Sequence, residues 1–99
     1  MITGAQCRAA RALSELSLET LARLAKLDAP VIDAFESKLS EPDADTISIL
    51  EKTLESAGVV FIPENGGGVG VRLKFNRSET RRISILEGEG GVVGNDDVP

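Results

Sequence analysis

The first 58 residues contain four runs of apolar residues at helical spacing, and each run begins near a residue that commonly caps a helix. Thr3 precedes the first run, which predicts a helix through about Leu13. Ser17 precedes the second, which extends to Lys26. Such short, separately capped runs predict helices that follow one another across tight turns.

Two further helices are predicted in the same way. Asp28 caps the third, and Pro30 is tolerated in its first turn because the N–H it lacks would be unpaired there. Asp43 or Asp45 caps the fourth, and Gly58 ends it. The buried faces of these two helices are predicted to comprise Ile32, Phe35, Leu39, Ile47, Leu50, Leu54 and Ala57.

The pattern then changes to short β-branched and alternating runs. "VVFI" at 59–62 and "VRLKF" at 71–75 predict two strands of a hairpin, and Ile83 to Leu86 could form a third. The glycine-rich residues between the first two strands predict a flexible turn. We therefore expect a mainly α protein with a helical domain over 1–58, β-strands over 59–87 and a flexible tail over 88–99.

Composition excludes several classes of protein. The 99 residues include no His, Trp or Tyr, and the formal net charge is −5. With a single cysteine, Cys7, no nucleophile–base pair can be proposed, so we expect neither an enzyme nor a bound cofactor. Zinc-type ligands are lacking, "EPDAD" does not have calcium-loop spacing, and "ENGGGVG" lacks the Lys and Ser or Thr of a phosphate-binding loop.

Cysteine usage and hydropathy indicate the compartment. A lone Cys7 cannot form an internal disulfide, which suits a reducing environment. No apolar run approaches the ~18 residues of a membrane span, and the N-terminus has no leader-like pattern. We expect a cytoplasmic protein that makes no contact with a membrane.

Three stretches carry a resemblance to a known family. "ITGAQCRAARALSELSLETLARLAKL", "TISILEKTLESAGVVFI" and "AGVVFIPENGGGVGVRLK" resemble the Xre-type (Cro and phage-repressor) helix-turn-helix regulators, in a small bacterial subgroup ending in "GVxFI", a glycine-rich turn and "GVRLK". The resemblance implies a repressor-like domain of four to five helices followed by a β-hairpin or small sheet. It also implies that duplex DNA is the partner, and that Arg11 and Glu36 form an internal ion pair.

The resemblance places the DNA-reading helix at about 28–37, where this sequence is unusual. The positions that would reach base edges carry small apolar residues and Asp33, although reading bases requires long donors and acceptors. Leu18 stands where relatives have a phosphate-binding Gln, and Lys26 and Lys38 stand where glycines are expected. The candidate residues for binding DNA or a protein partner are Leu18, Lys26, Asp28, Ala29, Pro30, Val31, Asp33, Ala34, Ser37 and Lys38.

Positive charge gathers after the second predicted strand begins. One interpretation is an arm that contacts phosphates, and the other is a polar strand face that protects a sheet edge from aggregation. The basic residues concerned are Arg72, Lys74, Arg77, Arg81 and Arg82.

Two functions follow from these patterns. The first is an Xre-type DNA-binding transcriptional regulator with an atypical acidic and apolar reading helix. The alternative is a degenerate helix-turn-helix protein that no longer reads DNA and instead binds and modulates another transcription factor. In either case a two-stranded hairpin is marginal alone, so we expect it to pack on the helices or to pair with a second subunit. The oligomer we expect is a homodimer through the C-terminal strands.

Overall fold

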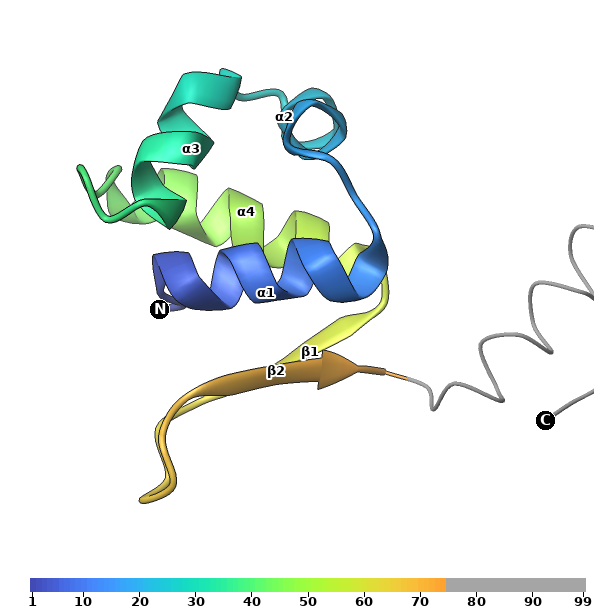
Figure 1. Cartoon of the computed structure of the whole chain (residues 1–99), viewed down its shortest axis with the longest axis vertical. Helices are drawn as coiled ribbons and strands as arrows, with labels where there is room; N and C mark the ends of the chain where they lie inside the picture. The colour runs from blue at the N-terminus through green and yellow to red at the C-terminus, as the bar shows by residue number, and fades with distance from the viewer. Residues whose placement is uncertain (75–99) are drawn as a thin grey trace, which may run out of the picture.

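The computed structural model describes residues 1–74 and contains four helices followed by a two-stranded antiparallel sheet (Figure 1). In chain order the elements are α1 (Gly4–Ser14), α2 (Leu18–Ala25), α3 (Ala29–Glu36), α4 (Ala44–Ser56), β1 (Val59–Ile62) and β2 (Gly70–Leu73). The prediction of a mainly helical fold with a small C-terminal sheet is confirmed for these residues.

The helices and the hairpin form three levels around α1. Figure 1 shows α1 and α4 as the middle level, α2 and α3 above them, and the hairpin below α1. The core lies where these levels meet, because every helix turns its apolar stripe inward. Its most deeply buried side chains are Cys7, Leu21, Ile32, Ile47, Leu50, Leu54 and Val59.

A capping box starts α1 and also attaches the hairpin to it. The Thr3 hydroxyl accepts the Gln6 N–H at 3.1 Å, and the Gln6 side-chain oxygen accepts the Thr3 N–H at 2.9 Å. The amide nitrogen of Gln6 then donates to the carbonyls of Ile62 and Gly70 at 3.3 and 2.8 Å. One buried side chain therefore holds the start of α1, the last residue of β1 and the first residue of β2 together.

The hairpin pairs Val59 with Leu73 and Ile62 with Gly70. Its glycine-rich turn has an internal organisation, because the Glu64 carboxylate accepts the N–H groups of Gly66 and Gly68 at 3.1 Å each. The turn that the sequence predicts is thus held by the acidic residue at its beginning.

Most predicted boundaries agree with the structure, and two predicted core residues are wrong. Leu39 is 79% exposed, because α3 ends at Glu36 and Lys38 adopts φ 63°, which turns the chain away from the helical stripe. Ala57 is exposed beyond the end of α4. The proposed third strand at 83–86 and the tail at 88–99 lie outside the described residues.

Helix α1 approaches α3 very closely at Gly4. A Cβ built on Gly4 would overlap the carbonyl oxygen of Phe35 and lie 2.9 Å from its carbonyl carbon. Because both of these atoms belong to the backbone, no side-chain rotation can make room. The crossing of the two helices therefore requires a glycine at this position.

We predict that Gly4→Ala destabilises the protein by about 3 kcal/mol, despite the better helix propensity of alanine. Thermal unfolding should show a fall in Tm of roughly 15 °C. The matched control is Gly67→Ala, whose Cβ would meet only the Asn65 side-chain oxygen at 3.6 Å. Equal Tm values for the two variants would contradict a tight α1–α3 crossing.

Candidate functional site

Helices α2 and α3 follow each other across a turn of Lys26, Leu27 and Asp28. Lys26 has φ 60°. Its N–H donates to the Arg23 carbonyl at 3.3 Å, and the N–H of Leu27 donates to the Ala22 carbonyl at 2.9 Å. The left-handed residue reverses the chain, and Leu27 packs against the core. Asp28 precedes α3 without a side-chain capping bond, and Pro30 lies in its first turn.

The core fixes which side of α3 is exposed. Ile32 and Phe35 are buried, so the opposite side of the helix faces outward. Val31 is 38% exposed even though it is apolar, whereas Ala29 and Ala34 are half-buried. The fully outward residues are Asp28, Pro30, Val31, Asp33 and Ser37.

The structure brings some of the predicted site residues together. Exposed Lys26 and Lys38 lie just before and just after α3, so they flank its outward side. Leu18 begins α2 half-buried and packs against the core. Arg72 and Lys74 lie on the hairpin, which α1 separates from α2 and α3 (Figure 1). Arg77, Arg81 and Arg82 lie outside the described residues.

The outward side of α3 offers little hydrogen-bonding capacity. Its charged groups are the carboxylates of Asp28 and Asp33, and Ser37 supplies one hydroxyl. Pro30 and Val31 form an apolar patch between the two carboxylates. A partner that fits this surface would have an apolar centre and basic groups that face Asp28 and Asp33. The nearby lysines could bind phosphate or carboxylate groups of a partner.

Behind α3, a buried ion pair connects the helix to α1. Arg11 donates from Nε to Oε2 of Glu36 at 2.9 Å and from Nη2 to Oε1 at 2.7 Å, which is a bidentate arrangement. The Glu36 side chain is only 3% exposed. Nη1 of Arg11 also donates to the Leu16 carbonyl at 3.2 Å, so the guanidinium braces the end of α1 as well.

Cys7 completes this cluster, and no local sequence pattern marks its role. Its thiol donates to Oε2 of Glu36 at 3.3 Å. Burial and the adjacent Glu36 carboxylate raise the pKa of the Cys7 thiol far above its ordinary value. The hydrogen bond to Glu36 likewise raises the pKa of Arg11. In this cluster the Glu36 carboxylate is bonded by Arg11 and by the protonated thiol of Cys7. These bonds join α1 to α3, so the role of the cluster is structural.

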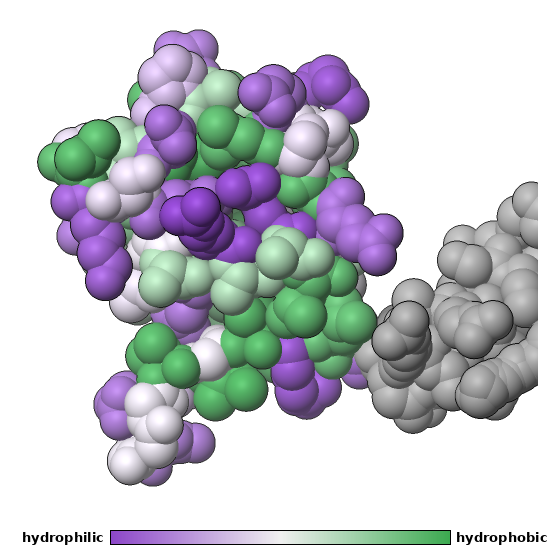
Figure 2. Space-filling view, viewed as in Figure 1, coloured by the Kyte–Doolittle hydropathy of each residue, from purple (hydrophilic) through white to green (hydrophobic). Residues whose placement is uncertain are grey.

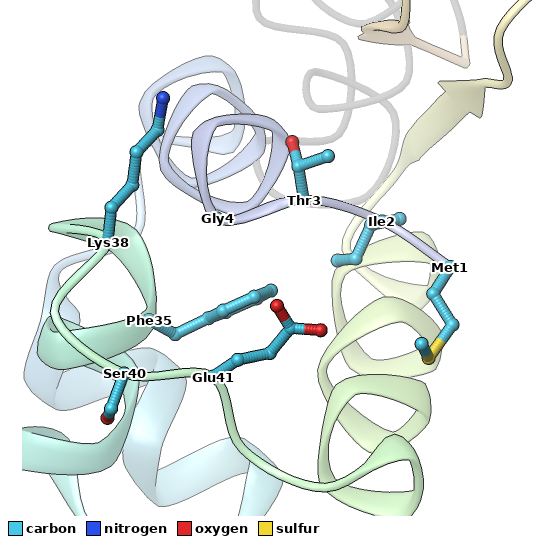
Figure 3. A pocket seen from close by; sticks show the side chains of 8 residues that line it. All are labelled: Met1, Ile2, Thr3, Gly4, Phe35, Lys38, Ser40 and Glu41. Atoms are coloured by element: carbon cyan, nitrogen blue, oxygen red, sulfur yellow. The ribbon is translucent and has the colours of Figure 1, made fainter.

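A separate recess of about 520 Å³ lies between the start of α1 and the end of α3. Figure 3 shows Phe35 and the Glu41 carboxylate pointing toward its middle, whereas Lys38 and Ser40 point away. It is largely apolar, with one carboxylate, and it does not include the outward side of α3.

Two further features bear on function. Within residues 1–74, no three His, Cys, Asp or Glu side chains are grouped so that they could hold a metal ion. Of the helices described, none has the length and apolarity to cross a membrane.

The comparisons with known proteins give no family. No protein-family model matches the chain, and no curated protein is significantly similar to it.

The two flanking lysines adopt a backbone conformation that favours glycine. Their φ values are 60° for Lys26 and 63° for Lys38. We predict that Lys26→Gly and Lys38→Gly each stabilise the protein by up to about 1 kcal/mol, because glycine adopts this conformation without a Cβ penalty. Urea denaturation measures the change.

Lys52→Gly is the control, because it removes the same charge from an exposed position inside α4 and should cost about 1 kcal/mol. A loss of stability in both Lys26→Gly and Lys38→Gly would show that the lysine side chains contribute more than their backbone strain.

Cys7 predicts a pH dependence of stability. Its pKa is raised on folding, so the stabilisation it gives is complete below the unfolded pKa of about 8.5 and is lost as pH rises above it. Above that pH the unfolded chain alone ionises the thiol. Above this pH the free energy of unfolding should fall with pH in both proteins or in the wild type alone, and the slope of the wild type should be steeper than that of Cys7→Ser by about 1.4 kcal/mol per pH unit. Parallel profiles of the two proteins between pH 7.5 and 10 would contradict this.

Proposed function

We propose that this chain is a helix-turn-helix transcriptional regulator of the Xre type, which presents the outward side of α3 to duplex DNA. The observation that carries the proposal is the α2–α3 pair, in which two short helices joined by a tight turn leave one side of the second exposed. The Arg11–Glu36 ion pair supports it, since it stands at the positions that the sequence resemblance implies.

Phosphate contacts would supply most of the affinity. Lys26 and Lys38 lie at the two ends of α3, where side chains of a helix seated in the major groove reach the DNA backbone. The six basic and ten acidic residues in the first 62 positions oppose tight binding. We therefore propose weak, strongly salt-dependent association.

Base reading by α3 would be limited. Val31 can contact a thymine methyl group, and Asp33 can accept a hydrogen bond from a cytosine amino group. No long donor stands on the outward side of the helix. Two half-sites bound by a homodimer through the C-terminal strands would supply the missing specificity.

A second candidate function is favoured by the composition of the same surface. Pro30 and Val31 are exposed between Asp28 and Asp33, which is an apolar patch with an acidic rim. Such a surface fits a basic, apolar segment of another transcription regulator. In this case the chain would be an adaptor that modulates that regulator without contacting DNA.

The deciding experiment is fluorescence anisotropy of a labelled random-sequence duplex, titrated at about 50 and about 200 mM salt. If the protein neutralises two or three phosphates, affinity should fall by roughly 10- to 100-fold between these conditions. Asp33→Gln and Ala34→Arg should each raise the affinity several-fold, because they remove a repelling charge or add a donor on α3.

The control is Glu55→Gln, which removes one exposed negative charge outside the α2–α3 pair. A gain in affinity equal to that of Asp33→Gln would show that net charge matters and the position does not. The absence of binding by the wild type and by both α3 variants at low salt would reject DNA binding by this surface and leave the adaptor function.

A further inference from the structure

The recess between the start of α1 and the end of α3 has the size and the walls of a small-molecule site. Its volume of about 520 Å³ lies within the range of pockets that hold such ligands. Ile2 and Phe35, which are 6% and 5% exposed, line it and belong to the hydrophobic core. Gly4 lines it too, and its contact with the Phe35 backbone sets the spacing of the two helices. The recess is therefore preformed.

Glu41 supplies the charge that faces this recess. Its carboxylate points toward the middle, whereas the Lys38 side chain points away (Figure 3). Within residues 1–74, Glu41 forms no hydrogen bond or ion pair. Pro42 restricts the backbone of Glu41 to extended conformations, and Asp43 caps α4 directly afterwards. The backbone that carries the carboxylate is thus constrained, while the carboxylate itself is available to a ligand.

These walls select a ligand by two properties. An apolar body gains free energy by leaving water and contacting Ile2 and Phe35. A cationic group gains a charge-assisted hydrogen bond to the carboxylate of Glu41. A neutral ligand of the same shape lacks the second contribution, and an anionic one is repelled by Glu41.

We propose that this recess binds a small organic cation, consisting of an ammonium group on an apolar body. The ammonium group donates to the Glu41 carboxylate, and the apolar body lies against Ile2 and Phe35. The recess does not include the outward side of α3, so the proposal stands or fails independently of DNA binding.

An NMR titration of the isotope-labelled full-length chain with 2-phenylethylammonium at constant salt tests the proposal. The expected Kd is in the millimolar range, because a ligand of this size makes few contacts. The amide signals of Ile2, Gly4 and Ser40 should shift and saturate, whereas those of the hairpin turn at 64–68 should stay in place. 2-Phenylethanol should bind about 5-fold more weakly, and phenylacetate more weakly still.

Two variants test the role of the carboxylate. Glu41→Gln keeps the shape of the side chain and removes its charge. It should weaken the binding of 2-phenylethylammonium about 5-fold and leave that of 2-phenylethanol unchanged. Glu55→Gln is the matched control, because it removes the same charge from an exposed position near the end of α4 and should change neither affinity. Thermal unfolding of each variant reports whether it is folded.

A different apolar surface offers a competing place for the ligand. Figure 2 shows apolar colour over α1 and the hairpin. Leu13 on α1 and Val69 beside β2 are exposed apolar residues that do not line the recess. Shifts that are larger at these two residues than at Ile2 and Gly4 would show adsorption to apolar surface and overturn the proposal.

Three further results would also overturn it. The first is the absence of saturable shifts at the recess up to about 20 mM ligand. The second is equal affinity for the ammonium compound and the alcohol. The third is an equal effect of Glu41→Gln and Glu55→Gln on affinity. If Glu41→Gln lowers Tm and leaves the affinity unchanged, the carboxylate serves only the positive end of α1, which contradicts the proposal as well.

Discussion

The position of α3 depends on a buried carboxylate. Glu36 ends this helix inside the protein, where an unpaired negative charge would cost several kcal/mol, and Arg11 is the cation that faces it. The bidentate geometry restricts how α3 is oriented against α1. Gly4 permits the close approach on which this geometry depends. The outward side of α3 is therefore determined by contacts on its hidden side.

The hairpin is attached by a similar device at a different part of α1. Gln6 is buried, and its amide group is shared between the helix cap and the carbonyls of two strands. Two polar side chains of α1 thus orient the two elements that pack on it, while apolar residues supply the burial. Hydrophobic contact is non-directional, whereas these hydrogen bonds are specific in angle and partner.

Local signals in the sequence predicted the secondary structure well. The caps Thr3, Ser17 and Asp43 and the strand "VVFI" are recognisable because the interactions that define them lie within three or four residues. The predicted burial of Leu39 is wrong because helical spacing alone does not reveal that the chain leaves the helix at Lys38. The bond from Cys7 to Glu36 joins residues 29 positions apart, and nothing local marks it. The Gln6 tether spans more than 50 positions and was missed for the same reason.

The candidate site combines an unfavourable backbone with a favourable charge. Lys26 and Lys38 adopt the left-handed backbone conformation, which costs an L-residue with a Cβ about 1 kcal/mol or more. A glycine at either position would not bear this cost. Each lysine instead places a cation beside a helix whose own exposed charges, Asp28 and Asp33, are negative. Neither lysine forms an ion pair or side-chain hydrogen bond within the described residues, so the fold itself does not use these charges. A cation at each end of α3 that the fold does not use is available to an anionic partner, and DNA phosphate is the partner that the proposed function supplies.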